Sequence, residues 1–200
     1  SSLHFNPAGL SQMARSELSA SSTSYIADTK YSWVGLAMPF GGGSRAVGFS
    51  MGSFGFKDQP VYTVEDPTGS EGQVYSVSES YLAVTYSQQF SDRFAAGFTG
   101  KYISDRLGDV TGQTFAVDFG TSFHANIGGR PIRAAFTIQN LGGTLQHTGK
   151  ALNALVNRQP PSGQQGIPQE PAAASLRSKE WALPIQFRVA LAYDLFTTSM

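Results

Sequence analysis

Hydrophobic and polar residues alternate with period two along most of the chain from Tyr81 onward. This period indicates β-strands whose two faces meet different environments. Five long runs show it, and no charged residue falls on the apolar face of any of them. These apolar faces are Leu82, Val84 and Tyr86; Phe94, Ala96, Phe98, Gly100 and Tyr102; Phe115, Val117, Phe119 and Phe123; Ile132, Ala134, Phe136 and Ile138; and Ile185, Phe187, Val189, Leu191, Tyr193 and Leu195.

The first part of the chain follows the same rule less cleanly. Val34, Leu36, Met38 and Phe40 form one run, Val47, Phe49 and Met51 form the next, and residues 16–25 make the weakest strand. Together the pattern predicts about eight strands, and no long stretch carries a helical period. Residues 159–174 are rich in Pro and Gln and are interpreted as a loop, because the strand pattern resumes at Ile185. We therefore expect one all-β domain over residues 1–200.

Short and long links alternate between the expected strands. The short links are residues 41–44, 91–92 and 127–130, and the longer, more polar links are residues 55–78, 104–112 and about 141–183. In an antiparallel up-and-down meander, alternate links lie at the same end, so the tight turns share one rim and the long loops the other. Outer-membrane β-barrels have this layout. This layout predicts that residues 142–183 form a long extracellular loop.

A soluble β-sandwich would show the same alternation with the apolar face inside. Strand length favours the membrane, because the runs match the roughly 9–11 residues of a tilted membrane strand. Aromatic residues also gather toward the ends of the runs, as in an interfacial girdle. The opposite face carries charged candidates for a lumen lining: Lys101, Asp118, Arg133, Arg188 and Asp194. These charges either line a permeation path or form salt bridges that stiffen the wall.

Composition excludes several classes of function. Net charge is +0 with 14% charged residues, so nucleic-acid binding is not expected. Cysteine is absent, which removes disulfides and thiolate zinc sites. No window reaches the roughly 18 apolar residues of a membrane helix. The first ten residues lack the pattern of a secretory signal, so we expect any export signal to lie upstream or to have been removed.

Few features of the sequence indicate an enzyme. His4, His124 and His147 lack metal-ligand spacing, and no G-x-S-x-G nucleophile elbow occurs. The sequence GGGSRA at residues 41–46 fits a dinucleotide pattern only superficially, because a strand follows where a helix is needed. We expect no enzyme activity, no cofactor and no metal.

The opening FNPAGL, residues 5–10, resembles the start of long-chain fatty-acid transporter (FadL-like) barrels. The succession SYIADTKYSWVGLAMPF, YLAVTYSQQFSDRFAAGFTGKYI, FAVDFGTSF, FTIQNLGG and LPIQFRVALAYDL resembles the PorV/PorQ family of outer-membrane proteins, which are relatives of that transporter. The resemblance implies a fourteen-stranded transmembrane barrel, of which about eight strands are present here. It also implies an N-terminal plug, residues 1–14, with the motif Asn6, Pro7, Ala8 and Gly9. Asn6 as cap and Pro7 in the first turn predict a short helix through about Met13.

The same resemblance implies location in the bacterial outer membrane, in contact with its lipid. The function it implies is that of an accessory or shuttle protein in type IX-like secretion, with secretion-system components or cargo as partners. The alternative is a FadL-like channel for hydrophobic small molecules such as fatty acids, for which the inward positions of Trp33 and Ile103 are the hints. A structural envelope protein is a second alternative.

Overall fold

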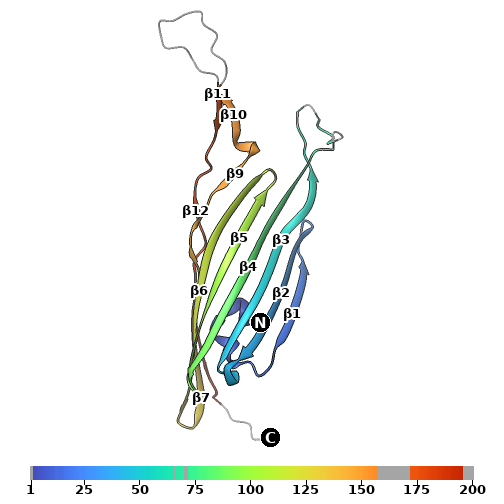
Figure 1. The fold of residues 1–200 in the computed structure, drawn as a ribbon. Coiled ribbons are helices and arrows are strands. Elements are labelled where there is room, and N and C mark those ends of the chain that lie inside the picture. Colours follow the sequence, from blue (N-terminus) through green and yellow to red (C-terminus); the bar gives the residue numbers. More distant parts are fainter. Residues whose placement is uncertain (1, 65, 70–71, 157–171, 196–200) are drawn as a thin grey trace, which may run out of the picture.

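The computed structural model describes residues 2–64, 66–69, 72–156 and 172–195. Eight long strands form one antiparallel sheet in chain order, and the sheet curls into an open trough (Figure 1). The strands are β1 (Glu17–Ser24), β2 (Thr29–Phe40), β3 (Arg45–Pro60), β4 (Val74–Ser91), β5 (Phe94–Leu107), β6 (Val110–Ile127), β7 (Arg130–Gly142) and β13 (Gln186–Tyr193). The expected antiparallel, up-and-down β fold is confirmed, and so is the number of long strands.

The tight links are where the sequence predicted them. The short 3-10 helix η2 (Gly41–Gly43) joins β2 to β3, and Gly128 and Gly129 join β6 to β7. All five glycines have positive φ, which glycine adopts at little cost because it has no Cβ. Two of the expected long links are shorter than predicted. Residues 55–60 and 74–78 belong to β3 and β4, and only residues 108–109 separate β5 from β6.

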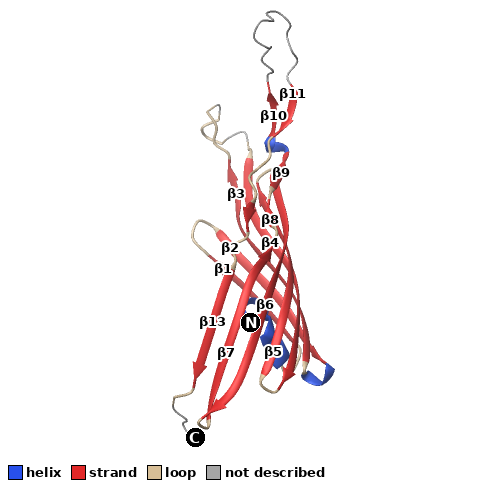
Figure 2. Ribbon diagram, turned by 90° about the vertical axis from the view of Figure 1, so that its left-hand side faces the viewer, coloured by secondary structure: helices blue, strands red, loops and turns tan. Residues whose placement is uncertain are grey.

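The connection between β7 and β13 also contains regular structure. Its elements are β8 (Thr144–Leu145), β9 (His147–Gly149), the 3-10 helix η3 (Lys150–Leu152), β10 (Asn153–Val156), β11 (Ala172–Ser175) and β12 (Trp181–Ala182). β8 pairs with β12, β10 pairs with β11, and β9 joins the edge of β6. The connection is thus a ribbon that stands beyond the sheet (Figure 2). Residues 157–171, with most of the Pro/Gln-rich segment, lie outside the described residues.

The two faces of the sheet have opposite polarity. The convex face exposes large apolar side chains, with Phe98 50% and Phe115 70% exposed. The concave face carries small and polar side chains, and there Thr85 and Thr99 are buried with their hydroxyls 2.9 Å apart. No other described element therefore covers the apolar face. In a soluble sandwich, by contrast, the core lies between two apolar faces.

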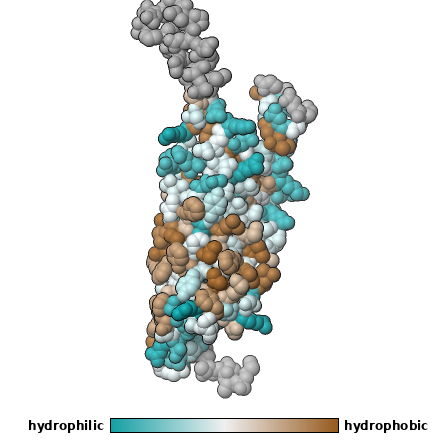
Figure 3. Space-filling model, in the orientation of Figure 1, coloured by the Kyte–Doolittle hydropathy of each residue, from teal (hydrophilic) through white to brown (hydrophobic). Residues whose placement is uncertain are grey.

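Strand register arranges the outward side chains in rows across the sheet. One row is entirely apolar: Val34, Met51, Leu82, Tyr102 and Phe115. The adjacent row toward the long-loop end, here called the polar row, is entirely polar: Ser32, Ser53, Ser80, Ser104 and Gln113. The apolar band is the set of outward residues from the first row down to Phe94 and Phe123. Figure 3 shows apolar side chains gathered across the middle of the sheet, with hydrophilic ones above and below.

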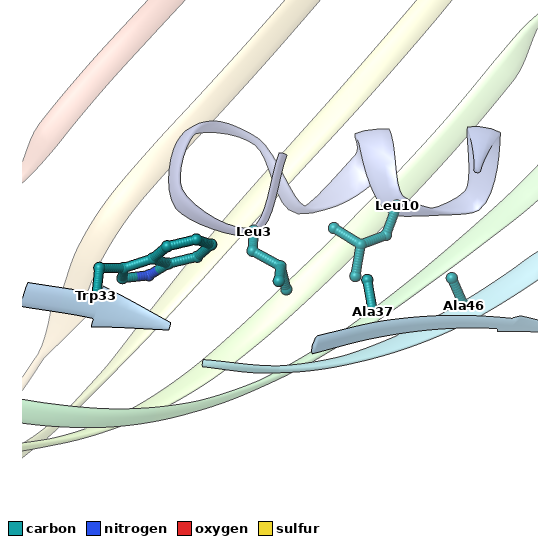
Figure 4. Packing of buried hydrophobic residues seen from close by; sticks show 5 residues of the cluster. All are labelled: Leu3, Leu10, Trp33, Ala37 and Ala46. Atoms are coloured by element: carbon teal, nitrogen blue, oxygen red, sulfur yellow. The ribbon is translucent and has the colours of Figure 1, made fainter. Parts of the chain in front are cut away.

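The N-terminal segment, residues 2–13, lies against the concave face. It consists of α1 (Ser2–Phe5), which the sequence did not predict, and the 3-10 helix η1 (Pro7–Gln12), which lies where the sequence predicted a short helix through about Met13. The break falls at Asn6, whose extended backbone (φ −154°) ends α1 and whose side chain caps η1. Leu3 and Leu10 pack on Trp33, Ala37 and Ala46 (Figure 4). No helix in the described part of the chain is both long enough and apolar enough to cross a membrane.

Candidate functional site

Glycines on the concave face form the seat of the N-terminal segment. A Cβ on Gly97 would collide with the backbone of Pro7 and Ala8, and one on Gly120 would collide with Asn6. Both glycines are thus required by the close approach of the segment. Their neighbour Ser87 donates its hydroxyl to the Ala8 carbonyl at 3.0 Å.

Polar contacts hold the segment at Asn6 and at His4. The Asn6 side chain accepts from the Ala8 N–H at 3.0 Å and donates to the Thr121 carbonyl at 3.1 Å. The amide of Gln139 donates to the His4 carbonyl at 2.9 Å. The motif residues Asn6, Pro7 and Ala8 therefore contact the sheet, and Pro7 occupies the first turn of η1 as predicted.

An ion pair lies directly above this seat, toward the long loops. Lys101 Nζ is 2.8 Å from Asp118 and donates to Asn140 Oδ1, also at 2.8 Å. The Asn140 N–H donates to the second Asp118 oxygen at 2.9 Å. Asp118 is only 3% exposed, and these bonds satisfy a carboxylate whose burial would otherwise be costly.

Asn140 takes part because the register of β6 and β7 shifts at this point, between Val117 and Phe119. The extra residue is a β-bulge, and Asn140 occupies it with φ 61°, a left-handed conformation uncommon for residues other than glycine. Bulges redirect side chains and recur beside functional sites. Sequence reasoning placed residue 139 at the end of a regular run and missed Asn140.

The other predicted lumen charges lie apart from this pair. Arg133 is 3.2 Å from Asp194 at the tight-turn end, where both side chains are largely exposed. Arg188 lies on β13 with its guanidinium 5.8 Å from the centre of the Phe5 ring. The structure thus joins Lys101 to Asp118 and Arg133 to Asp194, and leaves Arg188 beside the N-terminal segment.

A cavity of about 240 Å³ lies over the Lys101–Asp118 pair. Its lining mixes the charged side chains of Glu79, Lys101, Asp118 and Arg188 with the apolar side chains of Tyr81, Ile103 and Leu183. Ile103 faces inward as expected. Trp33 also faces inward, but it packs on Leu3 within the core under the N-terminal segment. This mixture of a few polar groups and apolar walls is typical of small-molecule sites.

Above the polar row the polarity of the sheet is inverted. Outward positions on β4 above this row are Ser76 and Ser78, while the inward positions of β3, β4 and β5 carry five apolar residues together with Gln59, Glu79 and Asp105. The five apolar inward residues, here called the apolar track, are Phe54, Phe56, Tyr75, Val77 and Leu107. The Phe56 and Tyr75 rings meet edge to face at 5.8 Å. The alternation of Tyr75 and Val77 with serines was the available signal, and it was missed because residues 55–78 were assigned to a loop.

The hydrogen-bonded ladder between β7 and β13 is interrupted beside the cavity. Their ladder ends at the pair Gln139 and Gln186, and pairing resumes beyond it at Thr144 and Ala182. Residues 140–143 and 183–185, here called the side window, have no ladder pairs with each other. One bond crosses it, from the Asn140 side-chain amide to the Pro184 carbonyl at 3.0 Å. Asn140, Leu183 and Pro184 all line the cavity, so the side window forms its flank.

A second polar cluster, here called the polar collar, lies in the same cross-strand row as Phe54, and its residue Glu79 also lines the cavity. His147 Nε2 is 2.9 Å from Asp105, and Glu79 is the register partner of Asp105 on β4. Burial, and then the negative charge of Asp105, raise the pKa of the Glu79 carboxyl. Glu79 and Asp105 lie above the polar row, outside the apolar band. In the described residues no group of His, Asp and Glu side chains could hold a metal ion.

No family model, curated protein or solved structure matches this chain.

Proposed function

We propose that this chain forms the wall of a β-barrel in the bacterial outer membrane and that its concave face provides a passage for hydrophobic small molecules with a polar or anionic head. The apolar band is the observation that carries the proposal. It covers the convex face, ends sharply at the polar row and extends on β5 from Phe94 to Tyr102. This length matches the roughly 9–11 residues of a membrane strand.

The passage is supported by the order of surfaces on the concave face. The apolar track lies at the long-loop end, the cavity with its charged groups follows, and the N-terminal segment lies below as a plug. An apolar tail fits against Tyr81 and Ile103, while an anionic head fits against Arg188 and against Lys101, which also contacts Asp118. The side window offers such a molecule an exit through the wall toward lipid.

A cysteine pair on one strand tests the membrane placement. The chain has no cysteine, so each variant carries a single thiol. Gln186→Cys faces the cavity, and Phe187→Cys faces outward from the apolar band with its native side chain 64% exposed. In reconstituted vesicles the thiol at 186 should react with a charged, water-soluble reagent, and the thiol at 187 only with a lipid-soluble maleimide. Equal reaction of both with the charged reagent would contradict the membrane placement.

Photocrosslinking tests the passage. A diazirine-bearing palmitate should label the apolar band without saturation, because the probe dissolves in the membrane lipid that contacts the band. Label at Tyr81, Ile103 or Leu183 should saturate and disappear with excess unlabelled palmitate. Lys101→Met combined with Arg188→Met should reduce the saturable label at least tenfold and leave the band unchanged. If no saturable label is found on the concave face, the passage is excluded.

A role in protein secretion is the second candidate, and the ribbon between β7 and β13 favours it. Paired strands β8 with β12 and β10 with β11 carry this connection beyond the sheet (Figure 2), where it could contact cargo or secretion components. Replacing residues 150–176 by a Gly-Ser linker should then abolish co-purification of defined secretion components. If co-purification persists in the linker variant, and palmitate labelling is lost in the variant with Lys101→Met and Arg188→Met, the ribbon is not the contact.

A further inference from the structure

A groove crosses the convex face of the sheet within the apolar band. Its volume is about 760 Å³, a size typical of small-molecule sites. One wall is the apolar row that ends at Tyr102 and Phe115, whose ring centres are 5.2 Å apart. The other wall is the next outward row toward the tight turns: Leu18, Leu36, Phe49, Val84, Gly100 and Val117. The groove thus opens on the opposite face of the sheet from the cavity.

The groove exists because Gly100 interrupts the second row. A Cβ added at Gly100 would meet no atom within 4 Å, so the space of a whole side chain is open there. Its register partners in the row are Val84 and Val117, both apolar. A glycine inside a strand gives up packing, and it often marks a place where another molecule approaches closely. An apolar groove of this kind fits a hydrocarbon chain.

The groove runs obliquely over the sheet, because it crosses strands that lean (Figure 1). Its end on β6 lies closer to the long loops than its end on β1. A hydrocarbon chain in the groove therefore points toward the long loops at β5 and β6. There the polar row, with Ser104 and Gln113, borders the apolar band. The head of such a molecule would lie among polar side chains.

The outward row directly beyond the polar row carries an arginine between two hydroxyl residues. Arg106 pairs with Ser78 on β4 and with Thr111 on β6, and all three occupy outward positions. The Arg106 Nε donates to the Gly108 carbonyl at 3.1 Å, which orients the guanidinium. Its terminal amino groups form no ion pair with a described residue. They can therefore donate to a phosphate, the anion that suits the fork geometry of arginine.

The outward charges on this face are all basic. From the row of Lys30 to the row of Arg45, the paired outward positions of β2 to β6 carry three charged residues: Lys30, Arg45 and Arg106. The carboxylates near Arg106 in sequence lie elsewhere, because Asp105 faces inward and Asp109 lies in the turn beyond the row. An anionic head at Arg106 thus meets opposite charge, and no carboxylate shares these outward positions.

We propose that the groove is a binding site for one membrane lipid with an anionic phosphate head, whose acyl chain lies over Gly100 and whose phosphate is held by Arg106 with Ser78 and Thr111. The site rests on the proposed membrane placement and is independent of the passage. Along β5, the path from Gly100 to Arg106 is about 20 Å long. In a strand tilted by about 40° this spans about 15 Å of depth, which is half of the hydrocarbon core and the share of one leaflet.

Native mass spectrometry of the purified chain in a nonionic detergent tests the site. The chain is offered dipalmitoyl phosphatidic acid or dipalmitoylglycerol, which have the same acyl chains and differ only in the phosphate. One phosphatidic acid should bind about tenfold more tightly, the difference expected for one charge-assisted hydrogen bond. Arg106→Gln should remove this preference. Gly100→Leu fills the groove and should weaken the binding of both lipids about tenfold, the loss expected for two methylene groups that are no longer buried.

Ala96→Leu and Arg45→Gln are the matched controls. Ala96 lies on the outward face of the same strand but outside the groove, and Arg45 lies at the tight-turn border of the apolar band. Both variants should bind the two lipids as the parent chain does. Equal binding of the two lipids by the parent chain, or an unchanged preference in Arg106→Gln, would overturn the site. Unchanged binding in Gly100→Leu would overturn the groove as the seat of the acyl chain.

The passage offers a competing location for the same lipid, and a further variant separates the two. Lys101→Met with Arg188→Met removes the basic groups of the cavity and should leave the preference for phosphatidic acid intact. If this variant loses the preference and Arg106→Gln keeps it, the lipid lies in the passage and the groove is not the site. The membrane placement fails separately, through the thiol labelling at residues 186 and 187.

Discussion

Replacing Gly97 by alanine tests whether the N-terminal segment is seated by the absence of a side chain. The added methyl group would meet the backbone of Pro7 and Ala8, which cannot rotate away as a flexible side chain can. The segment must therefore shift from the sheet. Gly100 lies three residues along the same strand, on the convex face, where an added Cβ meets nothing within 4 Å. Gly100→Ala is thus the matched control.

The size of the effect follows from what the docked segment buries. Leu10 is 0% exposed, and burying a leucine contributes about 1.5–3 kcal/mol. Each hydrogen bond of Ser87 with Ala8 and Ser11 adds about 1 kcal/mol. Overpacking a filled site costs about 1–3 kcal/mol, which is less than the whole docking energy. Gly97→Ala should therefore raise the undocked population about 5- to 150-fold without unfolding the sheet.

Thiol alkylation measures that population. Ser11→Cys is nearly isosteric and places the only thiol of the chain at a position that is 1% exposed when docked. The alkylation rate is then proportional to the undocked fraction when docking is fast compared with alkylation. Gly97→Ala should accelerate alkylation about 5- to 150-fold, and Gly100→Ala should leave it unchanged. Equal rates in the two variants would refute the glycine seat.

Three further predictions concern the same face. Asn6→Ala removes the cap of η1 and should weaken docking by about 1 kcal/mol, measured by the same alkylation rate. Asp118→Asn leaves the Lys101 ammonium without its ionic partner. It should lower the free energy of unfolding in urea by up to the roughly 3–5 kcal/mol of a buried pair, and Asp118→Leu with Lys101→Met should recover most of the loss. Burial, Lys101 and Arg188 lower the pKa of His4, so docking should weaken as the pH falls below about 6.5, and His4→Gln should remove this dependence.

The sequence predicted the fold wherever one strand face was continuously apolar. From Phe94 to Tyr102 and from Phe115 to Phe119 the period of two defines both the strand and its outward face, because a shift by one residue would exchange the faces. The cap at Asn6 and the glycine turns were also predictable, since their chemistry is local. These elements required no knowledge of distant residues.

The site depends on relations that a pattern does not contain. Lys101, Asp118 and Asn140 meet because of a one-residue bulge, and nothing in the local alternation near Asn140 marks it. His147 and Asp105 meet because the connection folds back across β6, a contact between residues far apart in sequence. Periodicity predicts which face a residue occupies, but it does not predict which residues on that face become neighbours.

The polar row explains why both polarity patterns occur in one sheet. Below it the convex face is apolar and the concave face is polar, the arrangement that suits lipid outside and water or a polar plug inside. Above it the convex face carries Ser76 and Ser78, which suit water outside, and the concave face carries the apolar track beside Glu79 and Asp105. In the proposed membrane placement, the outer solvent changes where the sheet leaves the bilayer partway along β4. The inward apolar residues above that level then need an apolar occupant, which the proposed passage supplies.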